Sequence, residues 1–549
     1  MKIGKFKIKL EWVFLVVFLI VFLWMGCANL FDNKISHDFP YGYLASDPFL
    51  HANHAQGIKE LGDGRVLPFY TNGFEDSING FPPLFNYLVA DFSILSGIEV
   101  YDLMYLFVFL FSALGIAILF LTVTYFNKNV AILSLPIMVL VFTKKFYTGF
   151  TWGQWDMYIG AFFLMGVVWS ISRSKLEKSW ILTGLFLTGA FLAHVVEAIW
   201  GIGFIGLYFL IELIVKRGSW DKFKKYILAG VVFVITSSAY LFFFLNSWFV
   251  ERLITIKTVK KEYFINWGNY SVINFKEFGM WLIVPILIGV VLLFYYIKKK
   301  DNTALLFSGY MFIMGFTYLI RFDKALQTRF LWPIYISVLF GITLYMIISL
   351  VPVKSKRILS IVVASVILVL LFNFQYEPLN TSGIMHQDLW NSLTWIKDNT
   401  NEKDTVLFFY GDGYSQDDQT KNNKRLSYVI RGQAIIDAVQ NRSIKRYYLT
   451  RMSKENPGSM LLYKKGFLEY GDHLKEADPL YFKGDMDICN FDYYVFDKYS
   501  RYEVLAQYSM IVKDLLLQNS GFEVVYENNF NVLLKNNNKG EDCIEPRQI

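Results

Sequence analysis

The feature that most constrains this chain is a series of long apolar runs separated by short polar segments. A run of about 18 or more apolar residues is long enough to cross a bilayer as a helix. With 54% hydrophobic and only 18% charged residues in 549, the sequence predicts a polytopic α-helical membrane protein with about eleven transmembrane helices. The predicted spans lie at about 12–31, 103–126, 130–143, 157–172, 180–195, 197–215, 226–247, 279–297, 304–320, 330–351 and 357–374.

Two of these spans, 130–143 and 180–195, are short enough to be buried helices instead. The positive-inside rule favours keeping both, because deleting either one reverses the orientation of every later segment. We therefore expect a multi-pass protein of the plasma membrane with a cytoplasmic N-terminus and an extracytoplasmic C-terminal domain. The basic clusters then predicted to face the cytoplasm are Arg173/Lys175/Lys178, Lys216/Arg217/Lys222/Lys224/Lys225, Lys298/Lys299/Lys300 and Lys354/Lys356/Arg357. They largely explain the net charge of +7, so we expect no nucleic-acid partner.

A polar region of about 170 residues follows the last span. An amphipathic helix followed by short apolar runs with turn residues at their ends predicts its helices and strands. We therefore expect a transmembrane domain over 1–376 and an extracytoplasmic α/β domain over 377–549. The predicted elements of the second domain are a helix at 390–400, a strand at 405–410, a strand at 491–496, a helix at 503–519 and paired strands at 522–526 and 530–534.

The three cysteines are too few for a disulfide framework. Cys27 lies at the end of the first span, whereas Cys489 and Cys543 share the α/β domain. The last two could pair in an oxidising compartment, but the sequence leaves their pairing open.

The large first external loop, 32–100, contains Asp47, Pro48, His51 and His54. Proline is favourable in the first turn of a helix, so a helix that begins here carries Asp47, His51 and His54 on one face at i, i+4 and i+7. An acid and two imidazoles together could hold a divalent cation or move protons. The alternative is that Asp47 only caps the helix, and spacing alone does not separate the two interpretations. Later in the loop, 84–96 is predicted as an amphipathic, interfacial helix after a Pro-Pro turn.

Further polar residues lie where predicted spans meet the external face. Asp156 follows Trp155 at the start of the 157–172 span, and His194 and Glu197 lie in the turn between two spans. An acid at such a depth is costly unless it caps a helix or faces a cavity. For His194 and Glu197, the structural alternative is a polar hairpin solvated by headgroups.

The stretch Asp47-Pro48-Phe49-Leu50-His51, just after an N-terminal span, resembles the first external loop of GT-C glycosyltransferases. It is most similar to the Asp-Pro-Tyr-x-His pattern of oligosaccharyltransferase catalytic subunits, and the layout of the chain is also similar. The resemblance implies a GT-C fold and a metal-assisted enzyme that transfers a sugar or glycan from a polyprenyl phosphate or pyrophosphate donor on the extracytoplasmic face. It implies that Asp47 is catalytic, in contact with the metal and the acceptor.

The position of Asp156 resembles the second acidic motif of that family, although Tyr158 stands where the family has a second acid. The resemblance implies that Asp156, with His194 or Glu197, completes a metal site with Asp47. Carboxylate and imidazole ligands suit Mn or Mg. The remaining site candidates, which would line the site or contact the acceptor, are His51, His54 and Trp155.

Arg329 precedes Phe330 and Pro333 at the start of the 330–351 span. This resembles the arginine with which the family holds the lipid phosphate, and arginine suits bidentate phosphate contact. Arg329 is the first candidate for binding the donor phosphate and Arg321 the second. The alternative is that these cations only bind anionic headgroups of membrane lipids.

Oligosaccharyltransferases read the acceptor sequon with a Trp-Trp-Asp-Tyr-Gly motif in the external domain. Phe408-Phe409-Tyr410-Gly411-Asp412-Gly413 stands at that place here. The expected acceptor is therefore a glycan, lipid or protein other than a sequon peptide, with a lipid-linked glycan or a polymer favoured. The alternative function is a transporter or a receptor-like scaffold with an external domain. The sequence shows no internal repeat, and its acids lie at the outer boundary of the membrane, which disfavours a transporter.

Overall fold

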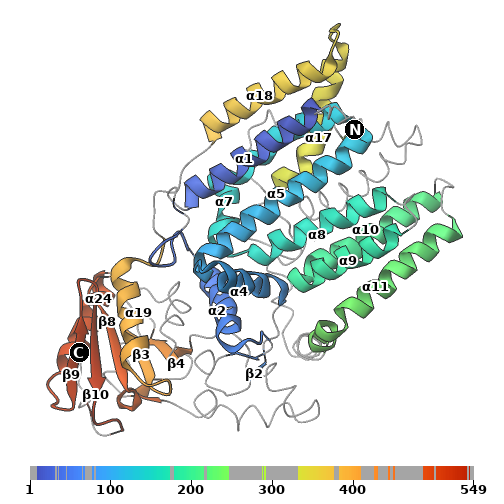
Figure 1. Cartoon of the computed structure of the whole chain (residues 1–549). Coiled ribbons are helices and arrows are strands. Elements are labelled where there is room, and N and C mark those ends of the chain that lie inside the picture. The colour runs from blue at the N-terminus through green and yellow to red at the C-terminus, as the bar shows by residue number, and fades with distance from the viewer. Residues whose placement is uncertain are drawn as a thin grey trace, which may run out of the picture.

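The computed structural model describes most of the helical part of the chain and the centre of the C-terminal domain. A bundle of long apolar helices lies on one side and a mixed β-sheet with flanking helices on the other (Figure 1). The described residues are 9–30, 34, 36–44, 46–64, 66–67, 77–78, 82–173, 178–214, 219–245, 287–288, 290–291, 332–375, 383–409, 426–430, 443–444, 449–451, 486–499, 503–540 and 543.

Within these residues, seven helices are long and apolar enough to cross a membrane. The chain is thus a multi-pass membrane protein, as its composition predicts. The predicted spans at 279–297 and 304–320 lie almost entirely outside the described residues, so the count of about eleven stays a prediction. The seven helices are α1 (Leu10–Leu30), α5 (Val100–Phe126), α8 (Trp155–Ser172), α10 (Val195–Ile214), α11 (Trp220–Phe244), α17 (Trp332–Leu350) and α18 (Lys356–Gln375).

Burial separates central from peripheral helices. Apolar windows of α8 and α17 are 72% and 67% buried, whereas those of α11 and α18 are each 17% buried. Apolar side chains exposed on a helix whose backbone is internally bonded are suited to lipid contact. We infer that α8 and α17 form the centre of the bundle and that α11 and α18 face lipid.

The two short spans are both helices. The run predicted at 130–143 is α6 (Lys128–Met138), which continues as a 3₁₀ turn, η1 (Val139–Phe142). The run predicted at 180–195 is α9 (Ser179–Ala193). α6 packs against α17 and α18, and α9 packs between α8 and α11. At about 1.5 Å per residue, each is shorter than a bilayer core of about 30 Å, so whether each one crosses stays a prediction.

The first external loop contains α2 (Ser46–Leu61), a small hairpin of β1 (Val66–Leu67) and β2 (Ser77–Ile78), and α4 (Leu84–Ser96). The predicted helix at 84–96 is confirmed. Its Phe85 and Val89 are buried, whereas Leu95 is 81% exposed. An apolar side chain exposed to this degree beside a membrane bundle agrees with an interfacial helix.

The C-terminal domain is a six-stranded sheet in the order β6-β4-β3-β8-β10-β9. The central strand β3 runs parallel to β4 and β8, and β10 joins β8 and β9 in antiparallel pairs. The α/β class is thus confirmed for this domain, with its predicted helices and strands in place. The strands are β3 (Thr405–Phe409), β4 (Leu426–Ile430), β6 (Leu449–Arg451), β8 (Tyr493–Asp497), β9 (Phe522–Glu527) and β10 (Asn531–Asn536).

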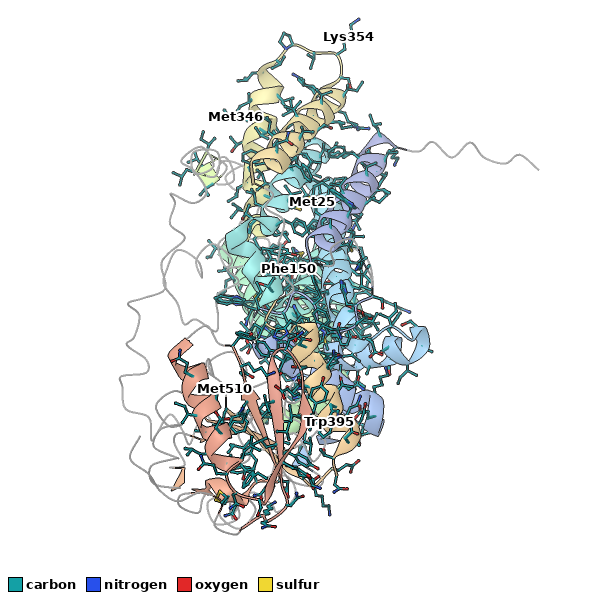
Figure 2. The ribbon with its side chains drawn as sticks, turned by 90° about the vertical axis from the view of Figure 1, so that its left-hand side faces the viewer. Met25, Phe150, Met346, Lys354, Trp395 and Met510 are labelled. Atoms are coloured by element: carbon teal, nitrogen blue, oxygen red, sulfur yellow. A yellow bond between two sulfur atoms is a disulfide. The ribbon has the colours of Figure 1, made fainter. Side chains whose placement is uncertain are left out.

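Successive residues of a strand point to opposite faces, so the sheet needs cover on both sides. Val406 and Phe408 pack with the helix α19 (Gln387–Asn399) on one face. Leu407 and Phe409 pack with α24 (Glu503–Leu516) on the other. Figure 2 shows this arrangement, with Trp395 of α19 and Met510 of α24 on opposite sides of the strands.

Two contacts complete the fold. Cys489 and Cys543 form a disulfide, which answers the question that the sequence left open, and Cys27 is a free thiol. The segment 36–44 joins the two domains, because Tyr43 forms a β-bridge with Gly383 and its carbonyl accepts from the N–H of Ile384 at 2.8 Å.

Candidate active site

The candidate site is built where the start of α2 meets the turn before α8. Gly153 in this turn has φ +79, a left-handed conformation that favours glycine. A Cβ at Gly153 would lie 2.4 Å from the nitrogen of Pro48. The N–H of Leu44 also donates to the carbonyl of Thr151 at 3.0 Å. The predicted helix at Asp47 is therefore confirmed, and its first turn rests directly on the Gly153 backbone.

Asp47 lies in the first turn of α2 and is partly exposed. Its Oδ2 accepts a hydrogen bond from Nε2 of Gln154 at 3.3 Å. Gln154 is the residue before α8, so the carboxylate reaches beyond its own helix. The interpretation of Asp47 as only a helix cap does not account for this contact.

His51 lies one turn further along α2 and is buried. Its Nε2 lies 3.1 Å from the carbonyl oxygen of Gly153, and its Nδ1 lies 3.3 Å from Oδ1 of Asp156. The ring packs between Phe85 and Trp155, with ring centroids 6.0 and 5.8 Å away. α2 and the first turn of α8 thus bring His51 and Asp156 into contact across 105 residues of sequence.

The tautomer of His51 follows from its partners. A carbonyl oxygen only accepts, so Nε2 must donate to Gly153 and, in the neutral ring, Nδ1 carries a lone pair. Burial lowers the pKa of His51 to about 4, the nearby imidazoles of His54 and His194 add to the lowering, and the Asp47 carboxylate opposes it. The ring is therefore neutral at pH 7. Nδ1 of His51 and Oδ1 of Asp156 then face each other, and neither has a hydrogen-bond donor from another described residue, so either a proton on the Asp156 carboxyl or a cation between the two atoms would satisfy both.

His194 and Glu197 lie at the break between α9 and α10. His194 has an extended backbone (φ −155, ψ 117) that ends α9, and its Nδ1 bonds the carboxylate of Glu197 in the first turn of α10. A Cβ at Gly160, one turn after Asp156 in α8, would lie 3.1 Å from Cβ of His194. This pair therefore packs on the same face of α8 as Asp156, with the side chain of His194 31% exposed and that of Glu197 1% exposed.

His54 and Trp155 support the site from within. His54 is 2% exposed and lies within electrostatic range of both His51 and Asp156. Trp155 is fully buried, and its indole N–H donates to the carbonyl of Phe150 at 2.6 Å. Trp155 thus forms a wall behind His51.

The predicted metal ligands are only partly assembled. In the part of the chain that the structure describes, no group of three or more His, Cys, Asp or Glu side chains is close enough to hold an ion. When the Asp156 carboxyl is ionised, its facing lone pair and that of His51 nevertheless fit a divalent cation, because a cation between them would remove the repulsion of two buried acceptors. Asp47 is near enough to His51 to affect its pKa. The four-residue set of Asp47, Asp156, His194 and Glu197 stays a prediction.

Several expected residues lie outside the described part of the chain, namely Arg321, Arg329 and the stretch 410–413. Gly153 and Gln154, which bond His51 and Asp47, are not among the site residues predicted from the sequence. The turn itself has a sequence signal. Gly153 lies two residues before the first residue of α8, and a glycine at such a place often marks a tight turn. The partners of both residues on α2, about 100 residues earlier, have no such signal.

No protein-family model matches the chain, and no curated protein sequence matches it. Solved structures do. AglB, the oligosaccharyltransferase of Archaeoglobus fulgidus, solved with an inhibitory peptide and a dolichol-phosphate, has a TM-score of 0.56 at 12% identity, covering 90% of this chain and 70% of that one. The same archaeal enzyme is also known in complex with Zn and sulfate.

Two further solved proteins share this architecture. ArnT from Cupriavidus metallidurans has a TM-score of 0.52 at 12% identity, covering 95% of this chain and 97% of that one, and it is also known bound to undecaprenyl phosphate. The arabinofuranosyltransferase AftD from Mycobacteria has a TM-score of 0.53 at 12% identity, covering 97% of this chain and 40% of that one. The helical bundle, the first external loop and the C-terminal domain of this chain together have the GT-C fold of these membrane glycosyltransferases.

Proposed function

We propose that this protein is a membrane glycosyltransferase that takes a sugar or glycan from a polyprenyl phosphate or pyrophosphate donor. The observation that carries the proposal is the junction of α2 and α8, where Asp47 bonds Gln154 and His51 faces Asp156. A surface acid that only caps a helix needs no such partners. In a GT-C fold, an acid and a buried imidazole–carboxylate pair at this place suit acceptor activation.

A lipid-linked donor is supported by the fold neighbours. AglB was solved with a dolichol-phosphate and ArnT with undecaprenyl phosphate, and both share the fold of this chain. Such a donor needs a cationic group for its phosphate, and Arg329, followed by Arg321, is our candidate because arginine stays protonated and binds phosphate in a bidentate manner. We expect the donor lipid to lie among the membrane lipids around the bundle.

A divalent metal, Mn or Mg, is proposed at the same junction. His51 Nδ1 and Asp156 Oδ1 would hold it, with Asp47 nearby and His194, oriented by Glu197, as a further ligand. Bound there, the metal would act as a Lewis acid that stabilises negative charge near the reacting groups. Because imidazole and carboxylate ligands suit several divalent ions, the identity of the metal is a matter for experiment.

The roles of the side chains follow from their placement. Asp47 is partly exposed and held by Gln154, so it is placed to orient an acceptor hydroxyl or amide and to take its proton. His51 is buried and its Nε2 is fixed by the carbonyl of Gly153, so it is placed to hold the proposed metal together with Asp156 and does not meet the acceptor directly. A protonated arginine would stabilise the charge that develops on the departing lipid phosphate.

The acceptor is proposed to be a glycan, lipid or polymer and not a sequon peptide. This rests on the sequence Phe408-Phe409-Tyr410-Gly411-Asp412-Gly413, which differs from a sequon-reading motif. The proposed location is the plasma membrane, with the C-terminal domain outside. The disulfide between Cys489 and Cys543 supports this location, because disulfides persist in oxidising compartments.

The test is transfer or hydrolysis of lipid-linked sugars by the purified protein in nanodiscs, with a panel of polyprenyl-phosphate donors. Asp47→Asn keeps the shape of the side chain and removes its charge, so donor binding should survive while turnover falls about a hundredfold or more. Asp91→Asn, an exposed acid of α4 in the same loop, is the matched control and should leave turnover unchanged. Full activity of a folded Asp47→Asn protein, or vectorial movement of a substrate without any transfer, would reject the proposal.

A further inference from the structure

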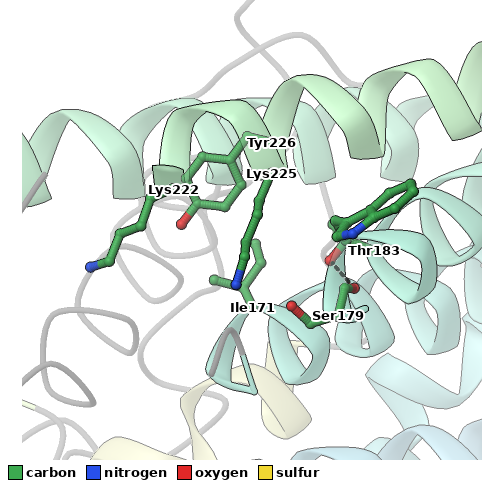
Figure 3. Close-up of a pocket in the computed structure, with 7 residues that line it drawn as sticks. Ile171, Ser179, Thr183, Lys222, Lys225 and Tyr226 are labelled. Carbon is green, nitrogen blue, oxygen red and sulfur yellow. Dashed lines mark hydrogen bonds between the residues drawn. The ribbon is translucent and has the colours of Figure 1, made fainter. Parts of the chain in front are cut away.

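A small hollow lies at the end of the bundle away from Asp47. The starts of α9 and α11 and the end of α8 enclose it (Figure 3). Lys222, Lys225 and Tyr226 come from α11, and Ser179 and Trp180 come from the start of α9. Among the described residues that line the hollow, two are cations and none is an acid.

The two lysines of this hollow are placed differently. Nζ of Lys222 lies 2.5 Å from Oε1 of Glu212, whose side chain is 1% exposed, so a buried carboxylate behind the hollow fixes this lysine. Figure 3 shows Lys225 extending from α11 toward Ile171 and Ser179. Lys225 therefore brings a second ammonium group to the hollow, beside the hydroxyl groups of Tyr226 and Ser179.

The helices that form the hollow are held tightly together just below it. A Cβ at Gly184 of α9 would lie 2.6 Å from the carbonyl oxygen of Ala229 in α11. One to two turns further, the hydroxyl groups of Thr188 and Thr236 lie 2.6 Å apart. α9 and α11 therefore pack closely against each other next to the hollow.

The exposed side chains of α11 indicate the depth of the hollow in the membrane. Trp220, at the start of the helix, is 72% exposed, whereas the apolar Ile227 and Val231 are 48% and 47% exposed. Tryptophan and lysine favour the interface, and exposed Ile and Val favour the lipid tails. Lys225 and Tyr226 lie between these two zones, which is the depth of lipid headgroups. The neighbouring basic clusters predict that this is the cytoplasmic face.

We propose that the phosphate headgroup of an anionic phospholipid of the cytoplasmic leaflet binds at the mouth of this hollow, which is itself too small to enclose a phosphate. Ammonium and hydroxyl donors match phosphate oxygens, and basic pockets between transmembrane helices on this side suit anionic headgroups. The acyl chains would lie against the exposed Ile227 and Val231 of α11. Free phosphate shares the headgroup chemistry but has no chains for this apolar surface. The site is separate from Asp47 and does not depend on the proposed function.

The experiment is native mass spectrometry of the full-length, delipidated protein with added phosphatidylglycerol or phosphatidylcholine. The wild type should retain phosphatidylglycerol preferentially. Lys225→Ala should lower this retention about fivefold, and Tyr226→Phe, which keeps the charge, should lower it about twofold. Lys224→Ala is the matched control, because Lys224 is adjacent and exposed but does not line the hollow. Lys225→Gln keeps most of the side-chain stem and serves if the alanine variant does not fold.

Three results would overturn the assignment. The first is unchanged phosphatidylglycerol retention in folded Lys225→Ala and Lys225→Gln proteins. The second is an equal loss in Lys224→Ala, which would show general attraction to a basic surface. The third is full displacement of phosphatidylglycerol by millimolar inorganic phosphate, which would show that the hollow binds a free anion and gains nothing from the acyl chains.

Discussion

Gly153→Ala, which adds a single methyl group beside Pro48, should displace the start of α2 and with it the candidate site. Its φ of +79 is strained for alanine, which costs about 1 kcal/mol. Its Cβ would lie 2.4 Å from the nitrogen and 2.5 Å from Cδ of Pro48. Ordinary contact begins near 3.4 Å, so Gly153→Ala must move the start of α2 by about 1 Å, and overpacking of this kind adds about 1–3 kcal/mol.

The displacement should affect activity more than stability. Asp47 and Pro48 are adjacent, so the shift that relieves the clash also moves the Asp47 carboxylate relative to Gln154 and Asp156. A misplacement of about 1 Å in an active site can cost about a hundredfold in rate. We therefore expect Gly153→Ala to unfold several degrees lower than wild type and to transfer sugar about a hundred times more slowly, measured as initial rates in nanodiscs and as thermal unfolding followed by tryptophan fluorescence.

Gly97 provides the control for backbone strain. It has φ +72 at the end of α4, and a Cβ there meets no atom within 4 Å. Gly97→Ala should therefore cost about 1 kcal/mol of stability and leave turnover close to wild type. If the two alanine variants have the same activity and the same unfolding temperature, the contact between Pro48 and Gly153 does not hold the site, and this reasoning is wrong.

Three further outcomes are expected. Arg329→Ala should weaken binding of polyprenyl phosphate about tenfold or more and slow turnover, because a phosphate contact is lost in both states; unchanged binding would remove Arg329 from the donor site. Cysteines introduced at 176 and 299 should be protected from a membrane-impermeant thiol reagent in sealed cells, whereas a cysteine at 265 should react. Labelling at 176 would refute the eleven-span topology. His51 has a folded-state pKa of about 4 against an ordinary value of 6.5, so in the metal-free protein its contribution to stability is complete above pH 6.5 and is lost as the pH falls toward 4, by up to about 3 kcal/mol. His51→Asn should flatten this dependence in pH-resolved thermal unfolding, and an unchanged profile would contradict it.

Local sequence patterns predicted the elements that depend on neighbouring residues alone. The helix that begins near Asp47 follows from proline at a helix start, and the helix 84–96 follows from a Pro-Pro turn before an amphipathic run. Strands β9 and β10 follow from two short apolar runs separated by polar turn residues. Each of these signals lies within the element that it predicts.

The pairings in the site could not be predicted in this way. Asp47 with Gln154, and His51 with Asp156, are separated by about 100 residues, and no pattern in one segment refers to the other. The resemblance to GT-C enzymes identified Asp47 as a candidate, and residue type together with position at the membrane boundary identified Asp156, His194 and Glu197. Which of them touch is decided by how α2 rests on the Gly153 turn and how α9 and α10 meet α8, and these are properties of packing.

The position of α2 is also linked to the C-terminal domain. The chain enters α2 through the segment 36–44, which is held by three sets of contacts. Nδ1 of His37 pairs with Asp102 of α5 at 2.9 Å, the carbonyl of Tyr43 bonds Ile384, and the ring of Tyr43 packs on Trp155 with centroids 5.3 Å apart. Tyr43 therefore touches the C-terminal domain and the indole behind His51 at once. Because a fully buried side chain transmits displacement to its neighbours, docking of the α/β domain and the geometry of the site are parts of one packing arrangement. We therefore expect that a shift of the C-terminal domain at Ile384 would be transmitted through Tyr43 to Trp155 and His51 in the candidate site.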